Sequence, residues 1–245
     1  MRRRGEWLAV SVANYLRRRG IERGRILDVG CGTGRVAIPL AMQGFDVVGI
    51  DISPRYIEIA TKRARELGLE THARFVLCDA REMAKCLQNY KPFDVVLFVW
   101  STVIGYYDRE DDVEILRQAL ELSHGETLLI IADTASKDFI SFLSNFVGNA
   151  KWFVDYDDYA VVESPLFNPV TGELITKQVF YAKKGRNLEY VGEANFKIKL
   201  YSLDELVSMA REAGWCLVEA LKSFASEEPY VTLGAINAVF KPCRG

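Results

Sequence analysis

The stretch Ile26-Leu-Asp-Val-Gly-Cys-Gly-Thr-Gly-Arg35 joins an apolar run to three alternating glycines. Its apolar first half predicts a buried strand. The glycines that follow allow backbone conformations and close approaches that a Cβ would forbid, so a ligand can lie directly against the main chain. A helix is expected over residues 34–43, with its free N–H groups directed at the glycine turn.

A second apolar run, residues 45–50, ends at Asp51, 21 residues after Gly30. This spacing is typical of the carboxylate that binds ribose hydroxyls in nucleotide-binding βαβ units. The glycines follow the pattern G-x-G-x-G, and Arg35 stands where the dinucleotide fingerprint G-x-G-x-x-G requires its last glycine. A dinucleotide oxidoreductase is therefore the weaker alternative.

Residues 27–34, Leu-Asp-Val-Gly-Cys-Gly-Thr-Gly, resemble the first motif of the class I S-adenosylmethionine-dependent methyltransferases. The similarity extends motif by motif to about residue 133 and more loosely to the end of the chain. The resemblance implies an α/β fold: a three-layer αβα sandwich with a seven-stranded, mostly parallel sheet whose last strand is antiparallel. It also implies S-adenosyl-L-methionine as methyl donor and S-adenosyl-L-homocysteine as product.

The same resemblance assigns a cofactor site by position. The glycine turn faces the methionine and ribose, Asp51 binds the ribose diol, and Asp28 helps to hold the turn and the amino group. Ile52 packs on the adenine, while Asp79 and the N–H of Ala80 bind its polar edge. The predicted cofactor-binding residues are Asp28, Gly30, Cys31, Gly32, Gly34, Asp51, Ile52, Asp79, Ala80 and Trp100. By its sequence context, Asp79 also suits the N-cap of a helix over 81–87, and its oxygens can serve both roles.

The apolar run 93–99 predicts a central strand that opens at its carboxyl end onto the site. Neither [Asp/Asn]-Pro-Pro-[Tyr/Phe] nor Pro-Cys follows this strand, which disfavours amino-adenine, glutamine-amide and cytosine acceptors. The next loop, with a Gly-Tyr pair before an acidic helix start, is similar to that of small-molecule methyltransferases. Candidates for orienting or deprotonating the acceptor are Tyr106, Tyr107 and Asp157. The acidic run 108–114 is expected to form a solvated helix N-terminus.

We interpret residues 1–245 as one methyltransferase domain, with an N-terminal helical cap over 1–24 and a substrate-side β insertion over 138–201. The insertion is expected to lie over the active site. Most of its aromatic side chains are expected to fill a sandwich core, and some to contact the acceptor. These aromatic residues are Trp152, Phe153, Tyr156, Tyr159, Phe180, Tyr181 and Tyr190.

Composition restricts the partners. A net charge of −2 argues against a protein made chiefly to hold nucleic acid. Eight arginines within the first 25 residues nevertheless leave open an RNA or protein methyltransferase that docks through its amino end. No apolar run reaches the ~20 residues of a membrane span. A monomer or homodimer is expected.

The five cysteines are an odd number without a C-x-x-C pair, and they predict reduced thiols, a cytoplasmic protein and no metal site. Neither histidine is well placed as a general base. Methyl transfer from a sulfonium depends on alignment more than on a base. The expected reaction is in-line displacement by an N, O or C nucleophile of a small molecule, and a cofactor-binding module without transfer activity remains an alternative.

Overall fold

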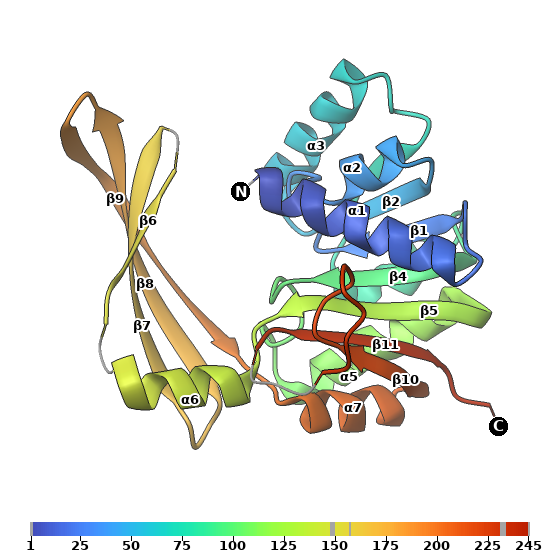
Figure 1. The fold of residues 1–245 in the computed structure, drawn as a ribbon. Coiled ribbons are helices and arrows are strands. Elements are labelled where there is room, and N and C mark those ends of the chain that lie inside the picture. Colours follow the sequence, from blue (N-terminus) through green and yellow to red (C-terminus); the bar gives the residue numbers. More distant parts are fainter. Residues whose placement is uncertain (1, 148–149, 157, 231–233, 245) are drawn as a thin grey trace.

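The computed structural model describes residues 2–147, 150–156, 158–230 and 234–244, and its centre is a seven-stranded sheet (Figure 1). The strand order is β10-β11-β5-β4-β1-β2-β3. Only β11 runs against its neighbours, so the predicted fold class is confirmed. The strands are β1 (Arg25–Val29), β2 (Asp46–Asp51), β3 (Ala73–Leu77), β4 (Phe93–Val99), β5 (Ser123–Thr134), β10 (Trp215–Leu221) and β11 (Ile236–Pro242).

Helices cover both faces of this sheet because its strands are apolar on both faces. Ile26 packs in one cluster with side chains of the first three helices, and the adjacent Leu27 packs in the other with side chains of the later ones. One layer holds α1 (Arg2–Arg18), α2 (Ala37–Met42) and α3 (Pro54–Glu66); the other holds the 3₁₀ turn η1 (Ala80–Glu82), α4 (Met83–Cys86), α5 (Arg109–Glu121) and α7 (Leu203–Glu212).

Helix α2 begins three residues later than the predicted 34–43. Gly34 has φ +73°, a left-handed conformation that a right-handed helix excludes. The N-cap, Val36, offers no side-chain acceptor. The glycine turn therefore extends to residue 36. The sequences Ser53-Pro54 and Ser202-Leu-Asp-Glu205 are typical of helix starts, and Ser53 and Ser202 are the N-caps of α3 and α7.

A second, four-stranded antiparallel sheet stands beside the main domain, after α6 (Lys137–Val147) (Figure 1). The N–H of Lys199 at its end donates to Gly105 O at 2.7 Å, which ties it to the loop after β4. Its strands, in spatial order, are β6 (Trp152–Asp155), β7 (Tyr159–Asn168), β8 (Glu173–Lys184) and β9 (Asn187–Lys199).

The expectation that most aromatic side chains of the insertion fill a sandwich core is wrong. This sheet is a single layer, and no other sheet of the described residues packs on it. Its exposed aromatic side chains are Trp152, Phe153, Tyr159 and Tyr190.

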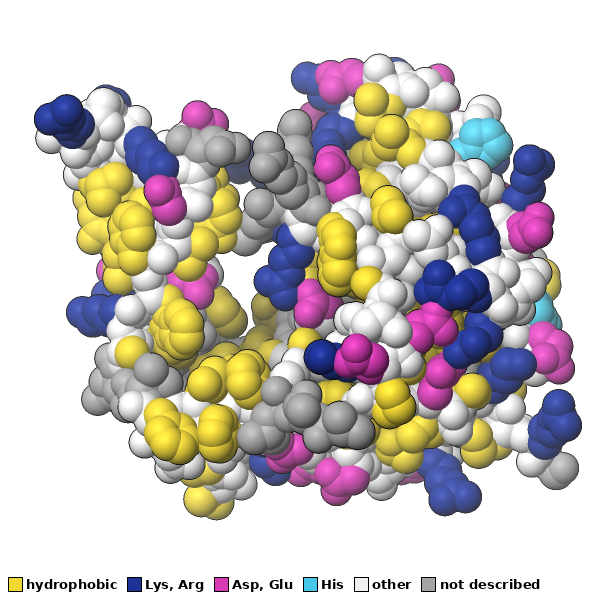
Figure 2. All heavy atoms as spheres, in the orientation of Figure 1, with side chains coloured by type: hydrophobic (Ala, Val, Ile, Leu, Met, Phe, Trp, Pro, Cys, Tyr) yellow, Lys and Arg dark blue, Asp and Glu magenta, His cyan; other side chains and the backbone are white. Residues whose placement is uncertain are grey.

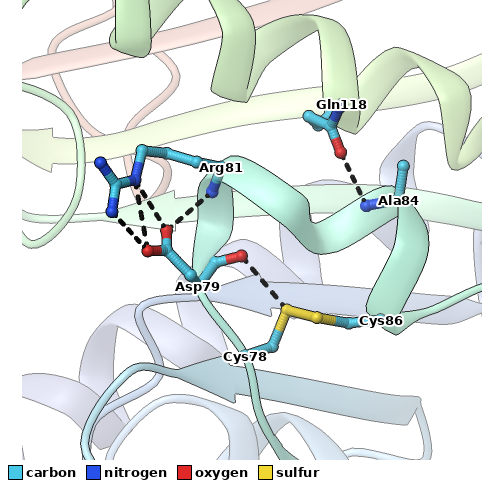
Figure 3. The surroundings of a disulfide bond; sticks show 6 residues. All are labelled: Cys78, Asp79, Arg81, Ala84, Cys86 and Gln118. Carbon is cyan, nitrogen blue, oxygen red and sulfur yellow. Dashed lines mark hydrogen bonds and ion pairs between the residues drawn. A yellow bond between two sulfur atoms is a disulfide. The ribbon is translucent and has the colours of Figure 1, made fainter.

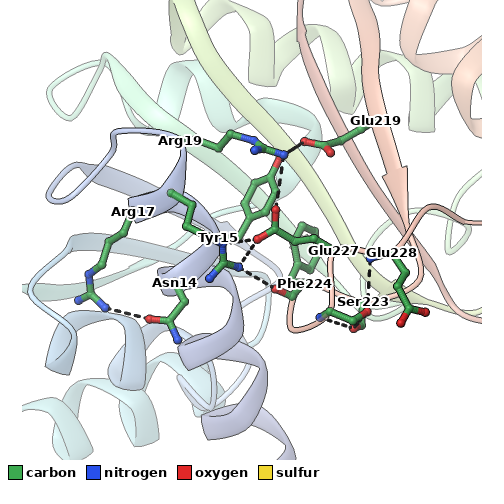
Figure 4. A network of polar contacts seen from close by, with 11 residues as sticks. Asn14, Tyr15, Arg17, Arg19, Glu219, Ser223, Phe224, Glu227 and Glu228 are labelled. Atoms are coloured by element: carbon green, nitrogen blue, oxygen red, sulfur yellow. Dashed lines mark hydrogen bonds and ion pairs between the residues drawn. The ribbon is translucent and has the colours of Figure 1, made fainter.

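Helix α1 is fixed to the last strands by a polar network (Figure 4). The buried Tyr15 hydroxyl donates to Glu219 at 2.5 Å, and Arg19 donates to the same carboxylate at 2.6 Å. Arg18 pairs with Glu227. These described N-terminal arginines are thus neutralised by carboxylates of the same chain, which weakens any basic surface for RNA.

The expectation of reduced thiols is also wrong, because four cysteines form two disulfides. Cys78 and Cys86 are joined across the turn that holds η1 and α4 (Figure 3). Cys216 and Cys243 are joined because the antiparallel pairing of β10 with β11 brings their Cα atoms to 5.0 Å. Neither pair has the short C-x-x-C spacing on which the expectation rested. Cys31 is free and buried.

Among the described residues, no helix combines the length and hydropathy needed to cross a membrane. Nor does that part of the chain gather three or more His, Cys, Asp or Glu side chains in a metal-binding arrangement.

Candidate active site

The glycine turn after β1 is anchored to the end of β2. The N–H of Gly32 donates to one carboxylate oxygen of Asp51 at 2.9 Å, and the N–H of Ser53 donates to the other at 2.9 Å. Gly32 has φ +54°, and a Cβ built there meets nothing within 4 Å. The turn therefore presents bare backbone and a carboxylate to open space.

A cavity of about 430 Å³ lies in front of this turn, at the carboxyl ends of β1, β2 and β4. Ten of the predicted site residues line it: Asp28, Gly30, Cys31, Gly32, Asp51, Ile52, Ala80, Trp100, Tyr106 and Tyr107. Sequence reasoning missed the rest of the lining: Arg35, Val36, Ile50, Ser53, Tyr56, Cys78, Val99, Thr102 and Val103.

Two predicted cofactor-binding residues are not in this lining. Gly34 packs inward, where a Cβ would lie 2.9 Å from the Phe75 ring. Asp79 caps η1 by accepting from the N–H of Arg81, and its carboxylate also binds the Arg81 guanidinium at 2.7 Å (Figure 3). Hydrogen bonding to Arg81 lowers the pKa of Asp79. The N-cap role of Asp79 is confirmed, and its adenine role stays a prediction.

Asp28 is a buried carboxyl beneath the turn and a member of the lining. Burial, and then the nearby charge of Asp51, raise its pKa to about 7, against the opposing effects of a backbone hydrogen bond and Arg35. Near neutral pH both protonation states of this carboxyl are therefore populated. A cationic group bound beside it would favour its ionised form.

Trp100 lies at the end of β4 in a left-handed conformation, with φ 57°. Its indole N–H donates to Asp133 at 2.9 Å, and the guanidinium of Arg35 lies 4.7 Å from the centre of its ring. Arg4 from α1 donates to the same Asp133 carboxylate at 2.6 Å. The N-terminal helix is thus connected directly to the carboxyl end of the central strands. Strained backbone conformations such as that of Trp100 are common at functional sites.

The loop after β4 is held by an aspartate inside the acidic run 108–114. Asp112 is completely buried, and its carboxylate accepts from the N–H of Gly105 at 3.0 Å and from the hydroxyl of Tyr201 at 2.8 Å. Burial raises its pKa to about 6. The expectation of a solvated run is wrong at this position, because Asp112 fixes the backbone just before Tyr106 and Tyr107.

A second cavity of about 530 Å³ lies between the end of the main sheet, α6 and the four-stranded sheet. Figure 2 shows an open hollow between the two parts of the molecule, bordered by hydrophobic side chains. Trp100 and Tyr106 line both cavities, so the two cavities adjoin at these side chains, which we call their junction. No sequence motif pointed to Glu163, which is half-buried in the wall of the second cavity. Asp157, a predicted candidate, lies outside the described residues.

The fold is that of the class I S-adenosylmethionine-dependent methyltransferases. Residues 22–182 match a family model described as a methyltransferase domain, and the chain belongs to that family. The predicted family, enzyme class and methyl donor are therefore confirmed.

Three similar proteins illustrate the relationship. A putative methyltransferase, YqeM of Bacillus subtilis (strain 168), is 24% identical over 209 residues, which cover 85% of this chain and 80% of YqeM. The structure of an S-adenosylmethionine-dependent methyltransferase from Clostridium acetobutylicum ATCC 824 has a TM-score of 0.79 at 15% identity, covering 97% of this chain and 91% of that one. The sugar N-methyltransferase KedS8 from Streptoalloteichus sp. ATCC 53650 has a TM-score of 0.68 at 16% identity, covering 98% and 87%.

The residues at the first cavity fit this cofactor. Its ribose diol requires hydrogen-bond acceptors, and the Asp51 oxygens retain capacity beyond the two N–H groups that they bind. Its adenine requires apolar surface, which the exposed side chains of Ile52 and Tyr56 offer at the rim. Bare backbone at Gly32 allows close approach.

Proposed function

We propose that this chain binds S-adenosylmethionine in the first cavity and methylates a small molecule held in the second. The observation that carries the proposal is the junction of the two cavities at Trp100 and Tyr106. A donor and an acceptor bound on either side of one junction are positioned for in-line transfer, and positioning alone supplies effective molarities of roughly 10⁵ M or more.

The cofactor supplies an electrophilic methyl carbon on a positively charged sulfur. Asp51 binds the ribose, Asp28 faces the amino group, and Ile52 and the N–H of Ala80 receive the adenine. Trp100, at the end of β4, and Tyr106, in the loop that follows it, would lie between the two reactants. The role of this chain is therefore to align two reactants, and its buried Asp112 contributes by keeping the loop rigid.

A small acceptor is favoured over RNA. The second cavity is largely apolar and lies between α6, the second sheet and the end of the main sheet, and KedS8, of similar fold, is a sugar N-methyltransferase. An RNA acceptor would need unpaired basic side chains, whereas Arg4, Arg18 and Arg19 are paired with carboxylates. Bulk transfer RNA that binds with a steep salt dependence would favour the RNA alternative instead.

Ligand-dependent thermal unfolding tests the proposed function. S-adenosylhomocysteine at about 100 times its dissociation constant should stabilise the fold by about 2.7 kcal/mol, whereas NAD at the same concentration should not raise the melting temperature. The enzyme should then convert S-adenosylmethionine to S-adenosylhomocysteine only when a small-molecule acceptor is present. Equal stabilisation by NAD, or none by S-adenosylhomocysteine, contradicts the proposal.

Cofactor affinity should depend on pH through Asp28. Its pKa is about 7, and the ionised carboxylate attracts the amino group of the ligand. As pH falls below about 7 the carboxyl takes up a proton, so the dissociation constant of S-adenosylhomocysteine should rise by up to tenfold per pH unit. Calorimetry between pH 5.5 and 8 measures this, and Asp28→Asn should flatten the profile. A wild-type affinity independent of pH contradicts the assignment.

A further inference from the structure

We infer that the methyl acceptor is an amine and that the carboxylate of Glu163 binds it in the second cavity. The inference rests on the proposed function, because it concerns the acceptor of that same reaction. One face of the four-stranded sheet forms a wall of this cavity.

Strand geometry gathers the wall residues on one face. Side chains two residues apart on a strand share a face, and residues directly paired across strands share it too. Glu163 pairs with Trp152 on one side and with Gln178 on the other. The apolar remainder of this wall consists of Pro165, Phe167, Leu174, Phe196 and Ile198.

Among the residues that the structure describes, Glu163 is the carboxylate of this lining without a cationic partner. The charged side chains of the described lining are Arg4, Asp133 and Glu163. Asp133 is satisfied by Arg4 and by the indole N–H of Trp100. The hydrogen-bond partner of Glu163 is the neutral amide of Gln178, at 2.7 Å.

A half-buried carboxylate in an apolar wall is costly unless a cation pairs with it. The cavity thus has an excess of one negative charge at a defined position, Glu163, and a ligand with a positive group would balance it. An alcohol or phenol would offer only a neutral donor, whereas an ammonium group adds Coulomb attraction to its hydrogen bond with the carboxylate.

The neighbour of Glu163 on the adjacent strand strengthens this preference. Trp152 is directly opposite Glu163 in the β6–β7 pair and lines the same cavity. Aromatic faces attract cations, most strongly when the ring is an indole. A carboxylate beside an indole suits an ammonium group, while the apolar wall suits the carbon skeleton that carries it.

Methylation of an ammonium group requires that one of its protons leave first. Transfer of one ammonium proton to Glu163 frees the nitrogen lone pair, which forms the new N–C bond as the carbon–sulfur bond breaks with its electron pair left on sulfur. Glu163 then returns its proton to solvent. The positive charge of the sulfonium passes to the methylated nitrogen, which the same carboxylate can bind.

The test uses matched probes on the full chain saturated with S-adenosylhomocysteine. Each probe pair consists of an arylalkyl or cycloalkyl amine and the alcohol of the same skeleton, and calorimetry measures both dissociation constants. The wild type should bind the amines roughly ten- to a hundredfold more tightly than the alcohols. Glu163→Gln should abolish this preference, and the matched control Glu189→Gln, at an exposed residue paired with Lys184 on the outer part of the sheet, should keep it.

Alcohols that bind as tightly as amines, an amine preference that survives in Glu163→Gln, or no measurable binding of any amine at millimolar concentration would each overturn the inference. Binding of S-adenosylhomocysteine is measured first in every variant. If the wild type does not bind S-adenosylhomocysteine, the proposed function fails. If the wild type and both variants bind it but the wild type shows no preference for amines, only the inference about the acceptor fails. With any of these amines that is methylated by the wild type, Glu163→Gln should lower kcat/KM by a factor similar to the lost binding preference.

Discussion

Asp51→Ala is expected to weaken the binding of S-adenosylhomocysteine by about 2 to 4 kcal/mol, or roughly 30- to 900-fold. Under the proposed assignment, the substitution removes the acceptors for two ribose hydroxyls. It also releases the N–H groups of Gly32 and Ser53, which the carboxylate binds at 2.9 Å each and which shape the glycine turn. Isothermal calorimetry at one pH and salt concentration measures the loss.

A control for this substitution lies at the other end of the same strand. Asp46 is the first residue of β2 and pairs with Arg74 and Arg25, away from the cavity. Asp46→Ala should leave the cofactor affinity within about twofold of the wild type, because surface ion pairs contribute little. If Asp51→Ala binds as well as Asp46→Ala does, the ribose assignment is wrong.

Gly105→Ala is expected to destabilise the fold by about 2 to 5 kcal/mol. Gly105 has φ +95°, and a Cβ there would lie 2.1 Å from the carbonyl oxygen of Lys199, a contact that no side-chain rotation relieves. Its N–H and carbonyl are also bound by Asp112 and by the N–H of Lys199. The substitution should separate the second sheet from the loop at Tyr106.

Thermal unfolding monitors this loss, with Gly125→Ala as the control, since a Cβ at Gly125 meets nothing within 4 Å. The control should change the free energy of unfolding by less than about 0.5 kcal/mol. Binding of S-adenosylhomocysteine below the unfolding transition separates a local effect on the loop from a global one. Equal stability of the two variants would show that the junction of loop and sheet tolerates a methyl group, contrary to this structure.

Structural features that depend on residues close together in the chain were predictable from the sequence. The glycine turn, the position of Asp51 at the end of β2 and the serine caps of α3 and α7 each depend on a few neighbouring residues. Parallel strands gather their carboxyl ends at one edge of a sheet, so these local motifs also located one cavity.

Features that depend on contacts between distant residues were not predictable in this way. Asp112 is one of several acids in its run, and the Tyr201 hydroxyl that binds its buried carboxylate lies 89 residues further along the chain. Cys216 and Cys243, 27 residues apart, are brought together by the pairing of β10 with β11. Glu163 reaches the second cavity only because of the register of β6, β7 and β8, which an alternating strand sequence does not specify.

The measurement that tests the central claim most directly is a crystal structure of the full chain with S-adenosylhomocysteine. We expect the ribose hydroxyls within hydrogen-bond distance of Asp51, the adenine beside Ile52, and the sulfur facing the junction at Trp100 and Tyr106. Density for the ligand elsewhere, or a glycine turn covered by the chain's own side chains in the crystal, would contradict the account.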